Sequence, residues 1–298
     1  MKSVSQPAQV DHYGLLRRRF GIFLSIMVLL SLASIFVVPL YWMVTGSLKY
    51  QKVTVDVPPE FFPAHPTLEN WHKLFYGPWP VWNWLLNSII VSLLTVVTVL
   101  LVSSLTGYSF GKKKFPGSGI LFFLLLSTMF LPSQVMLIPL FLLVRTLHLT
   151  DTTVGIYLAM ALPMLATPFG IFLVKQYCST IPDELIDAAR IDGASEWGIY
   201  YLIMLPLLMP ALAALAIFTF SNAWNNFMWQ LVIAADKFQY TLPVGVSYIA
   251  RTSAYGRDMI DIGLTMAGGT FGAIFMIVFF LAFQKYFVEG ITFGGVKG

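Results

Sequence analysis

The chain has 298 residues, of which 57% are apolar and 11% charged, and its mean hydropathy is +0.77. A soluble domain with an ordinary polar shell does not reach these values, so the composition places the chain in a lipid bilayer. The net charge of +4 does not indicate a nucleic-acid partner, because the basic residues lie beside apolar runs, where they set membrane topology. The single cysteine, Cys178, excludes an internal disulfide, and the sequence offers no Cys/His cluster for a metal ion.

Only helices and closed barrels satisfy all their backbone hydrogen bonds in lipid. The apolar segments of this chain are long unbroken runs without the alternation of apolar and polar residues that is typical of barrel strands. We therefore predict an all-α membrane protein with six transmembrane helices. The six apolar runs cover residues 21–44, 85–110, 118–144, 153–174, 201–227 and 262–283.

The first predicted segment, residues 1–19, is polar and ends in three consecutive arginines. The first transmembrane helix is expected at 20–46, because the apolar run at 21–44 spans about 36 Å at a rise of 1.5 Å per residue, which crosses a hydrocarbon core of about 30 Å. The alternative is a secretory signal with a cleavage site near Ser31–Ser34. The run continues well past that point, which favours a transmembrane helix.

Residues 47–83 form the longest polar stretch, which is rich in proline and too short for a domain of its own. We expect it to be an ordered external loop. The core transmembrane domain is predicted at 84–288, and a short cytoplasmic tail follows at 289–298.

The distribution of lysine and arginine sets the orientation. With six spans both ends lie on one side, and the excess of basic residues marks the cytoplasm. The sequence therefore predicts a multi-pass protein of the cell membrane with both ends in the cytoplasm. If the ends are inside, the inner segments hold eleven of the 18 basic residues: Lys2, Arg17, Arg18, Arg19, Lys112, Lys113, Lys114, Lys175, Arg190, Lys285 and Lys297.

Prolines interrupt the third and fourth apolar runs at the depth of the bilayer. The third run is expected to break at Pro132 and Pro139, with Ser133 and Gln134 between them, and the fourth run carries two further prolines. A proline frees the carbonyl four residues back, which neighbouring groups must then satisfy. Such helices line protein or water, not lipid.

A polar passage at 181–206 separates the fourth and fifth runs. Pro182 suits a first helical position and two acidic residues follow it, so we predict a short helix from there to about Ile191. Gly193 can adopt the left-handed conformation that ends a helix, and Ser195 can cap the next one. From these residues alone, a connecting loop whose amphipathic helix rests on the bilayer surface remains an equal alternative.

The spacing of Asp187-Ala188-Ala189, Gly193 and Ile203-Met204-Leu205-Pro206 resembles the EAA loop of permease subunits in binding-protein-dependent ABC importers. The departure is Asp187, where that family usually has glutamate. The resemblance implies the type I ABC importer permease fold. It also implies that the passage contacts an ATPase through Glu184, Asp187, Ala188, Ala189, Arg190, Gly193, Leu205 and Pro206.

Further segments are similar to the carbohydrate-uptake branch of that family, in the manner of the second permease of maltose systems. Asn226 departs from the branch, which often has aspartate there, and Thr270-Phe271-Gly272 stands where a proline is common. The matching segments are Asn87-Ser88, Pro132 to Gln134, Ile138-Pro139, Ile181 to Glu184, Ile191 to Ala194, Ala223 to Phe227, and the tail from Phe283 to Gly298.

The resemblance also implies partners. The sequence contains no G-x-x-x-x-G-K-[ST] motif, so we expect no cofactor on this chain and ATP bound by a separate ATPase subunit dimer. In the family the EAA helix docks on that ATPase, which implies that Gly193 sets the angle of the helix and Pro206 the bend of the fifth span. The other implied partners are a second permease subunit in a heterodimer, an extracytoplasmic solute-binding protein and membrane lipid.

Sugars are bound by aromatic faces and by neutral amides and hydroxyls. Two polar clusters supply these groups, one at the break in the third run and one at the end of the fifth. The aromatic and amide cluster has a second interpretation as an interfacial belt and helix cap, and Gln134 a second interpretation as a helix-to-helix hydrogen bond. The predicted substrate-path residues are Ser133, Gln134, Asn222, Trp224, Asn225 and Asn226.

Three other functions remain as alternatives. One is an ABC permease for a solute that is not a sugar. Another is an ion-coupled secondary transporter, but such carriers place ionisable residues within their spans, and the six runs contain none before Arg145. A membrane-embedded enzyme is the third, but the four histidines all lie in predicted loops or at the N-terminus, and no catalytic arrangement falls on a span.

Overall fold

The computed structural model describes residues 12–54, 58–252, 254–255 and 259–292, with side chains at 19–54, 58–252 and 261–285. Most of the predicted segments at 1–19 and 289–298 lies outside the described residues. The elements in chain order are α1 (His12–Ser47), α2 (Gln51–Thr54), α3 (Glu69–Tyr76), α4 (Val81–Lys112), α5 (Ser118–Ser127), η1 (Thr128–Phe130), α6 (Ser133–Thr146), η2 (Leu149–Asp151), α7 (Thr153–Ala161), η3 (Leu162–Met164), α8 (Pro168–Cys178), α9 (Glu184–Ile191), α10 (Glu196–Gly198), the π-helical η4 (Ile199–Met204), α11 (Leu205–Trp224), α12 (Met228–Ile233), α13 (Leu242–Thr252), β1 (Ala254–Tyr255), β2 (Met259–Ile260) and α14 (Ile262–Thr292).

Four helical segments are long and apolar enough to cross a bilayer: Arg19–Ser47, Val81–Lys112, Glu196–Trp224 and Ile262–Lys285. Two pairs of helices also qualify if each is counted as one bent span. In the first pair α5 and η1 meet α6 at 102°, and in the second α7 and η3 meet α8 at 58°. The count of six spans agrees with the prediction, and the all-α class is confirmed apart from the two-residue strands β1 and β2.

The bend in the third span lies at Pro132. This residue has an extended backbone (φ −60°, ψ 127°), which stops η1 and lets α6 start in a new direction. Thr167 is likewise extended because it precedes Pro168, and this explains the bend in the fourth span. The predicted break at Pro132 is confirmed, but the one at Pro139 is wrong. Pro139 lies inside α6, which continues through it at the loss of one backbone hydrogen bond.

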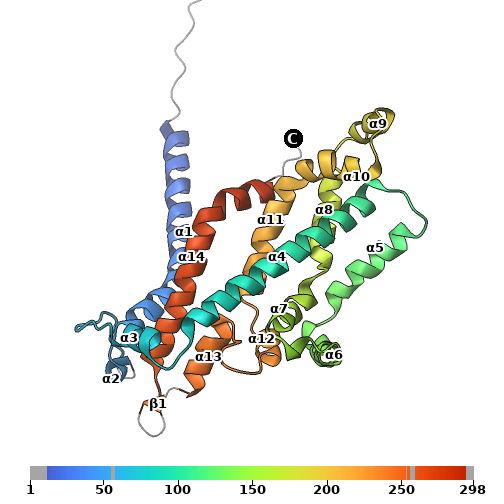
Figure 1. Cartoon of the computed structure of the whole chain (residues 1–298). Coiled ribbons are helices and arrows are strands. Elements are labelled where there is room, and N and C mark those ends of the chain that lie inside the picture. The colour runs from blue at the N-terminus through green and yellow to red at the C-terminus, as the bar shows by residue number, and fades with distance from the viewer. Residues whose placement is uncertain (1–11, 55–57, 253, 256–258, 293–298) are drawn as a thin grey trace, which may run out of the picture.

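The two described ends of the chain lie on the same side of the helical bundle. Figure 1 shows the start of α1, the end of α14 and the helix α9 on its upper side, with α2, α3 and α13 on the opposite side. An even number of crossings requires this arrangement. The predicted passage at 181–206 therefore shares a side with both described ends.

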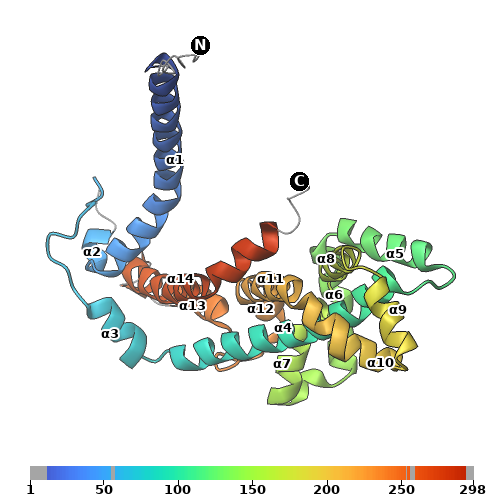
Figure 2. The same ribbon diagram turned by 90° about the horizontal axis from the view of Figure 1, so that it is seen from above.

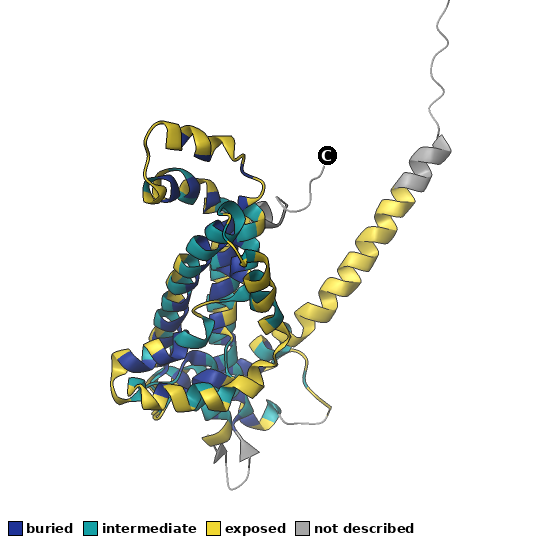
Figure 3. Cartoon of the chain, turned by 90° about the vertical axis from the view of Figure 1, so that its right-hand side faces the viewer, coloured by how far each residue is buried: buried dark blue, intermediate teal, exposed yellow. Residues whose placement is uncertain are grey.

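Helix α1 stands apart from the rest of the bundle along most of its length (Figure 2). Its side chains are exposed from Arg19 to Pro39, as Figure 3 shows, and the most apolar part of the helix has no buried residue. Only its C-terminal part packs on α14, where Thr270 Oγ1 donates a hydrogen bond to the carbonyl oxygen of Met43. A helix that is apolar on all sides in this way is suited to lipid or to another apolar surface.

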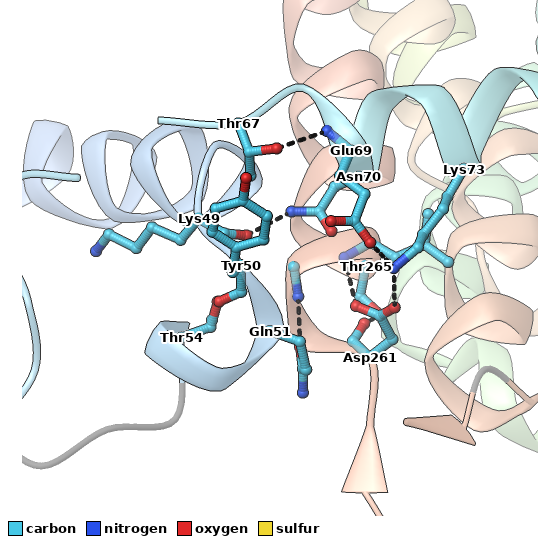
Figure 4. A network of polar contacts seen from close by, with 12 residues as sticks. Lys49, Tyr50, Gln51, Thr54, Thr67, Glu69, Asn70, Lys73, Asp261 and Thr265 are labelled. Atoms are coloured by element: carbon cyan, nitrogen blue, oxygen red, sulfur yellow. Dashed lines mark hydrogen bonds and ion pairs between the residues drawn. The ribbon is translucent and has the colours of Figure 1, made fainter. Parts of the chain in front are cut away.

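The polar stretch after α1 is tied to the start of α14 by hydrogen bonds (Figure 4). The buried Asn70 side chain donates from Nδ2 to the carbonyl oxygens of Ser47, at 3.0 Å, and Lys49, at 2.8 Å. Gly263 donates its amide to Gln51 Oε1 at 3.2 Å. The two bonds of Asn70 hold α3 against the end of α1, and the bond of Gly263 holds α2 beside α14.

Helix α4 is the centre of the bundle, since it packs against α7, α8, α11 and α13. Its approach to α8 is close because two glycines on α4 face that helix. A Cβ added at Gly107 would lie 2.6 Å from the Cβ of Val174, and one at Gly111 would lie 2.6 Å from the Cβ of Cys178. Small residues at this spacing let two membrane helices pack backbone to backbone.

The elements between the fifth and sixth spans had no clear signal in the sequence. Helices α12 and α13 and the antiparallel pair β1–β2 fill this region, and Tyr255 pairs with Met259. Trp84 on α4 fixes the segment before α13, because its Nε1 donates to the carbonyl oxygen of Lys237 at 2.6 Å.

Candidate functional site

The polar passage forms the helix α9, which starts at Glu184, two residues later than predicted. The backbone amides of Ile186 and Asp187 both donate to the carbonyl oxygen of Asp183. Glu184 and Asp187 lie in the first turn, where negative charge is favoured by the helix dipole. The prediction of a short helix in this passage is confirmed.

Gly193 ends α9 in the predicted left-handed conformation, with φ +81°. Its amide donates to the carbonyl oxygen of Arg190 at 3.1 Å, and the amide of Ala194 donates to that of Ala189 at 2.9 Å. These two bonds define a Schellman motif, which pairs the last free carbonyls of a helix. Ser195 then caps α10, since its Oγ accepts a hydrogen bond from the amide of Gly198 at 3.1 Å.

The two alanines of the predicted motif lie on neighbouring faces of α9, about 100° apart around its axis, and differ in burial. Ala189 is buried together with Ile186 in an apolar cluster that also contains Cys178 from the end of α8. Ala188 is exposed, and Leu185 and Ile191 are exposed on the same side. The helix is therefore seated on the bundle by one apolar face and offers a second one outward.

Arg190 on α9 pairs with one acidic residue of the same helix and with one at the start of α10. Arg190 Nη1 lies 3.1 Å from Asp187 Oδ1, and Arg190 Nε lies 3.0 Å from Glu196 Oε1. Asp187, the departure from the family pattern, thus reaches a partner on its own helix. Its side chain remains 66% exposed, which leaves it accessible to a further contact.

A π-helical turn, η4, leads from α10 into the fifth span and ends at Met204. Pro206 follows near the start of α11 and has no amide to donate, which is the kind of site where wider turns occur. Leu205 packs against the same apolar cluster as Ile186 and Ala189. The eight predicted ATPase-coupling residues therefore lie in one continuous stretch of chain between the end of α8 and the start of α11, and their docking role stays a prediction.

A cleft of about 810 Å³ lies where the third and fourth spans bend and the fifth span ends. Ser133, Gln134 and Asn226, three of the predicted substrate-path residues, line this cleft together. Thr128 and Trp229, which were not predicted from the sequence, line the cleft as well. The signal for Trp229 was weak, because it stands on a short helix that no long apolar pattern marks.

The other three predicted substrate-path residues do not line the cleft. Trp224 is 3% exposed and stacks on Phe275, with ring centroids 4.4 Å apart and planes 3° apart. Asn225 ends α11 and donates from Nδ2 to the carbonyl oxygen of Ser221 at 2.8 Å, and Asn222 is exposed. In this conformation Trp224 is a packing residue and Asn225 a helix cap.

Comparisons with known proteins agree with this architecture. Residues 103–292 match the family model of the binding-protein-dependent transport system inner membrane component. The chain is 36% identical over 271 residues to the arabinooligosaccharides transport system permease protein AraQ of Bacillus subtilis, covering 90% of this chain and 93% of AraQ. It is 31% identical over 281 residues to the sn-glycerol-3-phosphate transport system permease protein UgpE of Salmonella typhimurium, covering 93% and 97%.

The lactose transport system permease protein LacG of Rhizobium radiobacter is also similar, at 31% identity over 283 residues, covering 95% of this chain and 98% of LacG. Among solved structures, a bacterial ABC transporter that imports the acidic polysaccharide alginate matches with a TM-score of 0.73 at 22% identity. This match covers 95% of this chain and all of the matched chain. It supports the fold alone.

The apolar spans, two of them bent, and the short helix seated at one end of them define a multi-pass membrane protein. The chain belongs to the family of binding-protein-dependent transport system inner membrane components, that is, to the permeases of ABC importers. The resemblance seen in the polar passage is thereby confirmed.

Proposed function

We propose that this chain is the permease subunit of an ATP-driven importer that carries an uncharged sugar or oligosaccharide into the cytoplasm. The observation that carries the proposal is the composition of the cleft at the two bent spans. The described residues that line it include no ionisable side chain, and Ser133, Gln134 and Asn226 supply neutral donors and acceptors.

The rest of the lining suits the apolar faces of sugar rings. Phe227, Met228 and Trp229 supply aromatic and thioether surface on one side, and prolines from the bent fourth span lie on another. A phosphate or carboxylate would require a lysine or arginine in place of these groups, because an unpaired charge is costly in an apolar cleft. The names of AraQ and LacG include neutral sugars, which supports the same class of solute.

We further propose that both ends of the chain and α9 lie in the cytoplasm, because the predicted inner segments hold most of the basic residues. The exposed face of α9, formed by Leu185, Ala188 and Ile191, docks on a separate ATPase subunit. ATP binds to the dimer of these ATPase subunits and not to this chain. A second permease subunit and an external solute-binding protein complete the importer.

Competition between neutral and anionic solutes tests this proposal. Proteoliposomes that contain the complete importer are loaded with ATP. Labelled arabino-oligosaccharides and the binding protein are then added outside. Unlabelled lactose and sn-glycerol 3-phosphate are added separately as competitors. We expect the labelled sugar to accumulate without inhibition by sn-glycerol 3-phosphate. Inhibition by sn-glycerol 3-phosphate but not by lactose would contradict the proposal.

A further inference from the structure

The last residue of α4, Lys112, is a lysine with an almost buried side chain. The side chain is 5% exposed, and its ammonium group contacts both the carbonyl oxygen of Ile181 and Oδ1 of Asp183. Ile181 and Asp183 belong to the segment that connects α8 to α9. A lysine that only marks the cytoplasmic side of the membrane has no need of burial or of fixed partners.

The close packing of α4 on α8 explains this contact. Gly111, directly before Lys112, packs against Cys178, the last residue of α8. The end of α4 thus lies beside the start of the passage that leads to α9. Lys112 then reaches Asp183, which directly precedes the first residue of α9.

The next residue, Lys113, contacts the chain on the other side of α9. Lys113 forms an ion pair with Glu196, which starts α10 just beyond Gly193. Glu196 also accepts the hydrogen bond from Arg190 on α9. Lys112, the last residue of α4, and Lys113, the residue that follows it, therefore contact the two sides of α9. Lys112 contacts the chain before the first residue of α9, and Lys113 contacts it after the Schellman turn.

We propose that Lys112 is a positioning residue that couples α9 to the second span. Any displacement that the ATPase imposes on α9 then reaches the bundle by two routes. One route runs through Gly193 and η4 into α11, and the other runs through Lys112 into α4, which packs against α7, α8, α11 and α13. This inference rests on the proposed docking of α9.

The charges around Lys112 and Asp183 fit a positioning role for Lys112. Asp183 is 75% exposed at its side chain, so the pair alone contributes little to stability. The ammonium of Lys112 lowers the pKa of the Asp183 carboxyl, first through their hydrogen bond and second through their charges, and Lys114 and Arg190 act in the same direction. The contact therefore sets where α9 lies and contributes little to whether the bundle folds.

The test compares variants in the complete reconstituted importer, with its ATPase, second permease and binding protein. Lys112→Met keeps the length of the side chain without the charge, Lys112→Arg keeps the charge, and Lys114→Met is the matched control. Lys114 is exposed and has no carboxylate within ion-pair distance among the described residues. Two quantities are measured: arabino-oligosaccharide uptake per ATP hydrolysed, and hydrogen exchange of the backbone amides at 184–191 in the assembled complex.

We expect Lys112→Met to lower uptake per ATP about five- to tenfold, the size of a typical coupling between two sites, and to speed exchange in α9. Lys112→Arg is expected to keep both quantities near their wild-type values, and Lys114→Met is expected to change neither. The double variant Lys112→Asp with Asp183→Lys recovers part of the loss. A purely structural role would instead reduce the amount of assembled complex and leave uptake per ATP unchanged, and that result overturns the inference.

The exchange measurement also separates this inference from the proposed solute. If wild-type importer takes up no arabino-oligosaccharide, the sugar assignment fails, but faster exchange at 184–191 in Lys112→Met alone still supports the contact. Equal exchange in wild type, Lys112→Met and Lys114→Met overturns the positioning role, whatever the solute.

Discussion

Gly193 donates its backbone amide to the carbonyl oxygen of Arg190 over 3.1 Å while its own φ is +81°. Both properties are required at the end of α9, since the positive φ turns the chain and the hydrogen bond pairs a terminal carbonyl. A Cβ at Gly193 would meet no atom within 4 Å, so only the backbone restricts this position.

Gly193→Pro is therefore expected to abolish uptake while the protein still inserts into the membrane. Proline fixes φ near about −65° and has no amide, so it removes both the turn and the hydrogen bond. Gly193→Asn is the matched control, because asparagine tolerates the left-handed region. ATP-dependent uptake in proteoliposomes, normalised to inserted protein, measures the effect. Wild-type uptake by Gly193→Pro would show that the angle of α9 is not set here.

Trp224→Ala is expected to reduce the stability of the protein. The indole is buried between Phe220 and Phe275, and emptying such a site costs about 3–5 kcal/mol. Thermal unfolding in detergent measures the loss, with the 60% exposed Trp82 changed to alanine as the comparison. A large fall in apparent sugar affinity with an unchanged unfolding midpoint would instead return Trp224 to the substrate path.

Asn226→Ala is expected to weaken solute binding without a loss of stability. The amide lines the cleft, and one hydrogen bond is worth about 0.5–1.5 kcal/mol, so the concentration for half-maximal uptake should rise roughly three- to tenfold. Asn222→Ala provides the control, because Asn222 is exposed and lies outside the cleft. Equal effects of the two substitutions would argue against the cleft as the solute path.

The pair of Lys112 and Asp183 predicts how coupling depends on pH. The pKa of Asp183 is lowered in the folded protein, so its stabilising contribution is present above the unfolded-state value, about 3.9, and is lost only as the pH falls through the lower folded-state value. Uptake per ATP should therefore show no titration of this carboxylate between pH 5 and pH 8. Asp183→Asn should lower uptake per ATP by the same factor at every pH between 5 and 8. A loss confined to one end of this pH range would contradict the role of the Lys112–Asp183 pair.

The spans and the polar helix could be predicted from the sequence because their signals are local. Long apolar runs marked the six spans, Pro132 marked a real break, and Gly193 marked the end of α9. Pro139 misled the prediction, since a proline inside a helix costs one hydrogen bond and does not always end the helix.

The role of Lys112 could not be predicted in this way. In the sequence it is the first of three identical lysines, and only the three-dimensional packing distinguishes the buried Lys112 from the exposed Lys114. The available signal was the Gly107-x-x-x-Gly111 spacing directly before it, which indicates close contact with another helix. The burial of Trp224 could not be predicted for the same reason, because its contact with Phe275 depends on a helix far away in the chain.

The central claim is that this chain transmits the energy of ATP hydrolysed on another subunit. The most direct measurement is solute accumulation in proteoliposomes that hold the complete importer, with either ATP inside or an imposed proton or sodium gradient. We predict accumulation of arabino-oligosaccharides with ATP alone, and none when the partner ATPase is omitted. Accumulation driven by an ion gradient without ATP would contradict the account.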